Sequence, residues 1–201
     1  MAEVLIVSRT RMKNGVCCGG IDLETGEFIR IHNECGGNLS FDAPFQIQQI
    51  YSMDYKTAWN VRQKPHVEDK QVISYQLQRS ISTKELISLI QDKAPVFVGG
   101  LESIFDNCLV KSDYAPYICK NNIPNYSVCF WGPKYSLRLF NFMGKSRYAY
   151  EHNRISYVGF QEPVTIIPAE TLVRMSLANW WAPKDIDEKR CYLQLSGWYN
   201  L

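Results

Sequence analysis

The stretch "PHVED" holds the residues of this sequence best suited to acid–base chemistry. His66, Glu68 and Asp69 lie within four positions of one another. A histidine beside a carboxylate can move a proton, and two carboxylates can hold a divalent cation near a phosphate. The competing interpretation is a turn, in which Pro65 sets the backbone and the carboxylates pair with nearby lysines and arginines. A catalytic loop therefore stands as one hypothesis.

A metal site is the second chemistry to consider, because His32 and Cys35 are three residues apart in "HNEC". A structural zinc ion takes four ligands, usually from two such pairs. The second pair would have to come from Cys17 with Cys18, or from His66. Adjacent residues of a strand point to opposite faces, so only one of those two cysteines could be a ligand. We therefore expect no metal and no other cofactor.

The stretch "SRTRMKNGVCCGGI", residues 8 to 21, alternates cations with uncharged residues. In a strand, Arg9, Arg11 and Lys13 share one face at intervals of about 6.6 Å, twice the rise per residue. This interval approximates the phosphate spacing of an extended nucleic-acid strand, and contacts to phosphates would release counterions. The alternative is a solvated edge strand, whose charges prevent unwanted pairing. The glycines fit neither a Walker loop nor a dinucleotide fingerprint, and they indicate a bulge or a barrel corner.

Residues 129 to 154 interleave cations with aromatic rings and contain a single acidic residue. The alternation in "YSLRLFNF" places Arg138, Phe140 and Phe142 opposite two leucines, so the mixed face is the expected outer face. In "KSRYAYEH", Lys145 and Arg147 share one face. Bases that stack on such rings gain about 1–3 kcal/mol each. We therefore predict a ligand surface, with core packing of the phenylalanines as the alternative. Its expected members are Trp131, Arg138, Phe140, Lys145 and Arg147.

Paired tryptophans begin a loop of mixed charge, "NWWAPKDIDEKR". Trp180 and Trp181 are of the residue type that often anchors a protein partner. Packing inside the protein explains the pair equally well. A protein–protein adaptor that uses the Trp180–Trp181 region is therefore a further hypothesis.

The elements that must position these residues are mostly short strands. Runs rich in β-branched and aromatic residues alternate with Gly, Pro and Asn, as in all-β domains. One segment differs, because apolar residues at helical spacing and a capping box from Ser82 to Glu85 predict a helix at about 83–92. Residues 113 to 126, rich in Pro and Asn, are the expected linker. We predict a mainly β fold of two small OB-like Greek-key barrels with one or two short helices, residues 1–115 and 116–201.

Composition limits the class of protein. The 201 residues, 46% of them hydrophobic and 21% charged, can bury a core without disulfides. The net charge of +2 excludes a protein that coats DNA through its overall charge, so any nucleic-acid surface must be local. No run is long enough to span a membrane and no signal peptide is visible. The seven cysteines form no CxxC pair, so we expect reduced thiols and a cytoplasmic protein.

Three blocks, "LIVSRTRMKNGVCCGGID", "RQKPHVEDK" and "RCYLQLSGWY", resemble a bacterial family described as a dual OB-containing domain. The resemblance spans almost the whole chain and implies two OB-like barrels that bind nucleic acids or nucleotides. It also implies an association with bacterial conflict and defence systems. None of the blocks is a catalytic signature. We therefore expect a non-enzymatic module that binds single-stranded DNA or RNA or a nucleotide. A metal-dependent hydrolase or nuclease that uses the His66 loop, and a protein adaptor, remain the alternatives.

Overall fold

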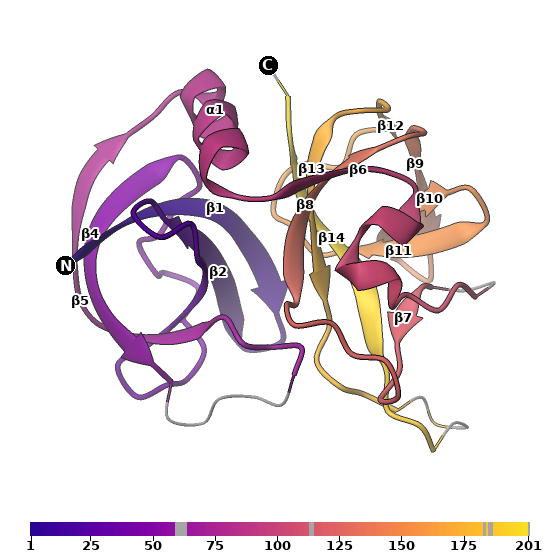
Figure 1. Cartoon of the computed structure of the whole chain (residues 1–201), viewed down its shortest axis with the longest axis horizontal. Coiled ribbons are helices and arrows are strands. Elements are labelled where there is room, and N and C mark those ends of the chain that lie inside the picture. The colour runs from indigo at the N-terminus through magenta and orange to yellow at the C-terminus, as the bar shows by residue number, and fades with distance from the viewer. Residues whose placement is uncertain (59–63, 113–114, 183, 185–186, 201) are drawn as a thin grey trace. The chain divides into compact units, whose positions relative to one another are not determined.

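The structure is a computed structural model that describes residues 1–58, 64–112, 115–182, 184 and 187–200 (Figure 1). Its contacts divide the chain into two compact units. The first comprises Met1–Gln63, Val67–Pro95 and Tyr199–Leu201, and the second comprises Lys64–His66 and Val96–Trp198. The main part of the first unit thus ends at Pro95, ahead of the boundary at 115 that the sequence suggested. No helix among the described residues is long and apolar enough to cross a membrane.

The first unit is a closed five-stranded barrel with the strand order β1-β2-β3-β5-β4. Its neighbouring strands are antiparallel except β3 and β5, which run parallel. The first residues of β1 pair with β4 and the later ones with β2, which closes the barrel. This is the strand order of an OB fold. The strands are β1 (Ala2–Met12), β2 (Gly15–Asp22), β3 (Phe28–His32), β4 (Gln49–Thr57) and β5 (Asp69–Ser80).

Alternation along these strands builds the core of the barrel. Val4 and Ile6 of β1 and Ile29 and Ile31 of β3 are buried in one cluster, so their neighbours in sequence point outward. The helix α1 (Thr83–Lys93) follows β5, and the Ser82 hydroxyl oxygen accepts a hydrogen bond from the Glu85 backbone N–H at 3.2 Å. The predicted helix and its capping residue are therefore confirmed.

The second unit contains one sheet in the order β12-β9-β10-β11-β14-β13-β8-β6, with β7 beside β14. Three further residues separate β8 from β9, and the two behave as one interrupted first strand: β8 pairs with β13 while β9 pairs with β10. β11 and β14 run parallel, as β3 and β5 do. The elements are β6 (Val96–Gly99), η1 (Leu101–Ser103), η2 (Phe105–Asn107), β7 (Tyr117–Ile118), β8 (Val128–Pro133), β9 (Leu137–Phe142), β10 (Lys145–Tyr150), β11 (Asn153–Tyr157), β12 (Ile166–Ile167), β13 (Leu172–Leu177) and β14 (Cys191–Tyr199).

The strand orders of the two units are therefore equivalent. If β8 and β9 count as strand 1, then β10, β11, β13 and β14 are strands 2, 3, 4 and 5 of the same OB order. The predicted mainly β fold with two OB-like domains is confirmed, and the described residues contain a single α-helix.

Candidate functional site

The outer sides of β9, β10 and β11 bring cations and aromatic rings together. The register of β9 and β10 places Phe142 opposite Lys145 and Phe140 opposite Arg147. One step further, Ala149 of β10 lies opposite Arg138 of β9 and, on its other side, opposite Arg154 of β11. Residues directly opposite in an antiparallel pair share a face of the sheet. We name this surface the β9–β10–β11 face, with the members Arg138, Phe140, Phe142, Lys145, Arg147 and Arg154.

The other side of the same strands belongs to the core, which fixes the direction of this face. Leu137, Tyr148 and Tyr150 are fully buried. The Tyr148 hydroxyl accepts a hydrogen bond from the backbone N–H of Val164 and lies 2.9 Å from the carbonyl oxygen of the same residue. A strand with such a buried side must direct its alternate residues outward. Arg138 and Lys145 are accordingly exposed.

The charge on this face is not neutralised within the sheet. Across the described residues, no ion pair joins any of its four cations to a carboxylate. The Arg147 guanidinium lies 5.5 Å from the centroid of the Phe142 ring. Its Nε atom is buried and has no hydrogen-bond partner in the described part of the chain. Cations gathered without acids create a local positive potential that attracts anions.

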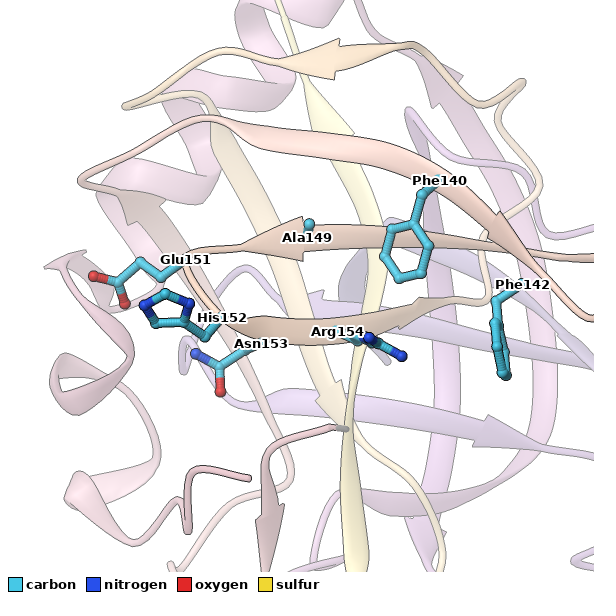
Figure 2. Close-up of a pocket in the computed structure, with 7 residues that line it drawn as sticks. All are labelled: Phe140, Phe142, Ala149, Glu151, His152, Asn153 and Arg154. Atoms are coloured by element: carbon cyan, nitrogen blue, oxygen red, sulfur yellow. The ribbon is translucent and has the colours of Figure 1, made fainter. Parts of the chain in front are cut away.

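A hollow of about 460 Å³ is cut into this face (Figure 2). Figure 2 shows the rings of Phe140 and Phe142 towards one end and Glu151 and His152 at the other, where β10 turns into β11, with Arg154 between them. Ala149 contributes only a methyl group to the floor, which leaves room above β10. The volume is in the range of sites for small ligands, about 300–1,000 Å³.

Arg154 is one of the cations of the stretch 129–154, but it was not among the residues that the sequence predicted for this face. The signal for it was the short turn at Glu151 and His152, which returns the chain so that Arg154 lies opposite Ala149. By contrast, the predicted role of Trp131 in ligand binding is corrected. Trp131 is fully buried, and its indole N–H donates to the carbonyl oxygen of Gly99 at 3.1 Å. It belongs to the core of the second unit.

The basic row on β1 is only partly a surface feature. The Arg9 guanidinium donates to the carbonyl oxygens of Phe41 at 2.7 Å and of Ala43 and Phe45 at 2.8 Å. Arg9 therefore holds the segment between β3 and β4. Arg11 and Lys13 are exposed at the end of β1, and their contact with a ligand stays a prediction.

Of the residues in the predicted catalytic loop, His66 belongs to the second unit and is buried there. Its Nε2 atom lies 3.1 Å from the carbonyl oxygen of Ala178 and 3.8 Å from the Cys191 sulfur. Burial raises the pKa of the Cys191 thiol to about 12, so this sulfur stays protonated and is a poor nucleophile. The ring of His66 therefore packs among groups of the interior.

Glu68 and Asp69 belong to the first unit and are also buried. The Asp69 carboxylate pairs with the Arg30 guanidinium, and one of its oxygens lies 3.2 Å from Nε2 of His32. Burial acts to raise the pKa of Asp69, but the hydrogen bonds from His32 and Arg30 hold that pKa well below its usual range. Asp69 is therefore a permanent anion in a buried network, a poor choice for a general base at neutral pH.

The metal hypothesis finds no cluster to support it in the described residues. They hold no group of three or more His, Cys, Asp or Glu side chains placed to share a metal ion. His32 is buried beside Asp69, whereas Cys35 is exposed.

The two tryptophans of the predicted partner site differ in their contacts and exposure. The indole N–H of Trp180 donates to the carbonyl oxygen of Lys64 at 2.8 Å, while Trp181 is 58% exposed.

Comparison with known families decides what kind of module carries this site. Residues 2–198 match the family described as a dual OB-containing domain. The chain belongs to the dual OB-containing domain family. No curated protein matches it. OB folds bind ligands across strands 2 and 3 and the loops that connect strands 1–2 and 4–5. In the second unit of this dual OB-containing domain, strands 2 and 3 are β10 and β11, so the cationic face lies at the position where OB folds bind.

Proposed function

We propose that this dual OB-containing domain is a non-enzymatic binding module whose second unit binds single-stranded DNA or RNA, or a nucleotide, on the β9–β10–β11 face. The observation that carries the proposal is the arrangement of four cations and two phenylalanine rings on one sheet face, where no carboxylate of the described residues forms an ion pair with these cations. An accessory role in a bacterial defence system, which the resemblance implied, would suit a protein that recognises single-stranded nucleic acid.

The spacing on this face matches the chemistry of a single strand. Neighbouring strands are about 4.8 Å apart, and alternate residues of one strand are about 6.6 Å apart. Arg138 and Phe140, or Lys145 and Arg147, can thus reach successive nucleotides, with cations on phosphates and rings on bases. Trp181, exposed on the loop between β13 and β14, can add a further stacking ring, because this loop connects strands 4 and 5.

The first test measures salt-dependent binding of labelled single-stranded DNA and RNA dodecamers by fluorescence anisotropy. Four phosphate contacts predict a slope of log K against log salt of about −2.8, at about 0.7 per contact for single strands. The double variant Arg138→Ala/Arg147→Ala should bind more weakly, with a slope near −1.4. The matched control is Lys111→Ala/Lys120→Ala, which removes two exposed cations of the same unit outside this face. It should keep the wild-type affinity.

A second arm separates stacking from charge. Phe140→Ala/Phe142→Ala should lower the affinity by about 1–3 kcal/mol per stacked base. The salt slope should stay at its wild-type value, because no cation is removed. Circular dichroism of each variant checks that the fold is retained. Failure of the wild-type chain to bind any oligomer or nucleotide at low salt would overturn the proposal, and so would an equal loss of binding in the lysine control.

A hydrolase that uses His66, Glu68 and Asp69 would need these side chains to reach a substrate, and all three are buried.

A further inference from the structure

Strand β5 of the first unit continues beyond its neighbour β3. β3 ends at His32, and its parallel pairing with β5 covers only Asp69, Lys70 and Gln71. β4 accompanies β5 as far as Ser80. On the side away from β4, residues 73–80 consequently have no neighbouring strand in the described part of the chain. All eight of these residues are exposed. Such an edge presents backbone N–H and C=O groups that can pair with another chain.

A groove of about 520 Å³ lies beside the first part of this edge, up to Tyr75, and we name it the β5 groove. Leu77 continues the same side of β5 just beyond the groove. Val72, Ile73 and Tyr75 of β5 form one wall, and the segment between β3 and β4 forms the other. Core residues such as Phe45 reach its floor, where the Phe45 ring lies 4.9 Å from the ring of Tyr75 in an edge-on contact. The Arg9 hydrogen bonds hold the opposite wall in place, so little ordering is needed when a ligand binds.

Three apolar side chains of this edge are open to solvent, and two of them, Tyr75 and Leu77, alternate regularly along β5, whereas Ile73 lies where the pairing with β4 shifts register. Ile73, Tyr75 and Leu77 are 54%, 49% and 47% exposed. Tyr75 and Leu77 lie opposite the core residues Met53 and Tyr51 of β4, so they are on the inner face of the barrel wall and yet remain open to solvent. The barrel wall therefore has a gap beside residues 73–80, beyond the end of β3.

The charge of the β5 groove is opposite to that of the β9–β10–β11 face. Its described lining contains no lysine or arginine, and Glu34 is its acidic member. Asn14, Asn33 and Asn38 supply amide groups around the rim. A lining of this composition offers no cation to a phosphate, whereas it suits a neutral or basic chain with its own backbone amides.

We infer that the β5 groove binds an extended segment of a partner protein, which adds to β5 as a further strand. Backbone hydrogen bonds to residues 73–80 provide affinity, and apolar side chains at alternate positions pack against Tyr75 and Leu77. A lysine or arginine of the segment faces Glu34. This activity goes beyond the proposed nucleic-acid binding, because it uses the other unit and a different chemistry.

The test selects peptides from a random dodecapeptide library displayed on phage, with the full chain as bait, and then measures synthetic peptides of the enriched sequences by calorimetry. We expect enriched sequences with alternating apolar residues and at least one basic residue. Hydrogen exchange should show that these peptides protect the amides of residues 73–80. Leu77→Lys and Glu34→Lys should each weaken binding by about tenfold or more, the effect of losing a well-packed or charged contact. The matched control, Gln76→Lys, changes an exposed residue on the other face of β5 and should stay within about twofold.

Three results would overturn the inference. The first is a selection whose peptides bind Leu77→Lys as well as wild type or leave residues 73–80 unprotected. The second is a dimer, seen by ultracentrifugation and broken by Leu77→Lys, which would make a second copy of the chain the occupant. The third is weakened oligonucleotide binding in Leu77→Lys, which would assign the groove to nucleic acid. If the wild-type chain binds oligonucleotides but selects no peptide, this inference alone is refuted, and Arg138→Ala/Arg147→Ala separately tests the proposed function.

Discussion

Arg9 belongs to the row of cations that the sequence assigned to phosphate, but its guanidinium donates to three carbonyl groups of one segment. Arg9→Ala leaves those carbonyls without their donor. Hydrogen bonds that involve a charged group contribute about 1.5–3 kcal/mol each, so the free energy of unfolding should fall by at least about 2 kcal/mol. Urea denaturation measures this loss, with Lys13→Ala, at an exposed position of the same basic row, expected within about 0.5 kcal/mol of wild type. If the variant kept the wild-type stability but bound oligonucleotides more weakly, Arg9 would instead be a ligand-binding residue, as the sequence predicted.

Asp69 makes the stability of the first unit sensitive to acid. Its carboxylate is buried against Arg30 and His32, and its pKa is held below the unfolded value of about 3.9. A carboxyl with a lowered folded pKa stabilises the fold fully above the unfolded pKa and loses that stabilisation as the pH falls towards the folded pKa. We therefore expect urea midpoints to decline below about pH 4.

The variant Asp69→Asn tests this assignment. It should cost about 3 kcal/mol at pH 7, because it leaves the Arg30 guanidinium buried without its anion, and it should flatten the decline below about pH 4. The matched control is Asp54→Asn, an exposed position on β4 of the same unit, which should keep the wild-type profile. An Asp69→Asn variant with the full acid dependence of wild type would show that other carboxylates control it.

At the scale of elements, local sequence patterns predicted the elements that local interactions stabilise. The capping box of Ser82 and the apolar spacing placed α1 almost to the residue. Alternation identified the two faces of β10 but not which one is buried, because either tyrosines or cations could have faced water. Alternation failed for β8, where all six residues are buried. Both sides of β8 are covered, so its sequence shows no alternation from which the burial of Trp131 could be predicted.

The equivalence of the two strand orders could not be predicted from the sequence either. The runs that became β8 and β9 look like separate strands, and only their pairing with β13 and β10 shows that together they close the second unit. Such pairings join residues far apart in the chain and leave no local pattern. The β5 groove escaped prediction for the same reason, since it exists because β3 ends while β5 continues.

At the scale of the whole molecule, the two OB-order units differ in the charge on equivalent faces. In the first unit, Arg30 of β3 lies opposite Asp69 of β5 and forms an ion pair with it, so the cation of strand 3 is neutralised within its own sheet. In the second unit, Arg154 of strand 3 has no carboxylate partner among the described residues, and three further cations accompany it. Because affinity for phosphates follows unneutralised local charge, the duplication of the fold does not imply a duplication of the site.

This difference predicts one oligonucleotide per chain. Titration calorimetry with a single-stranded hexamer at low salt should give a stoichiometry of one, since the β9–β10–β11 face gathers four cations that form no ion pair among the described residues. In Arg138→Ala/Arg147→Ala all of the observed binding should then lose affinity, because the chain has no second site that would keep the wild-type affinity. A stoichiometry of two, or a component of the wild-type affinity that survives in this variant, would show that the first unit binds nucleic acid as well, through cations such as Arg11 and Lys13 at the end of β1.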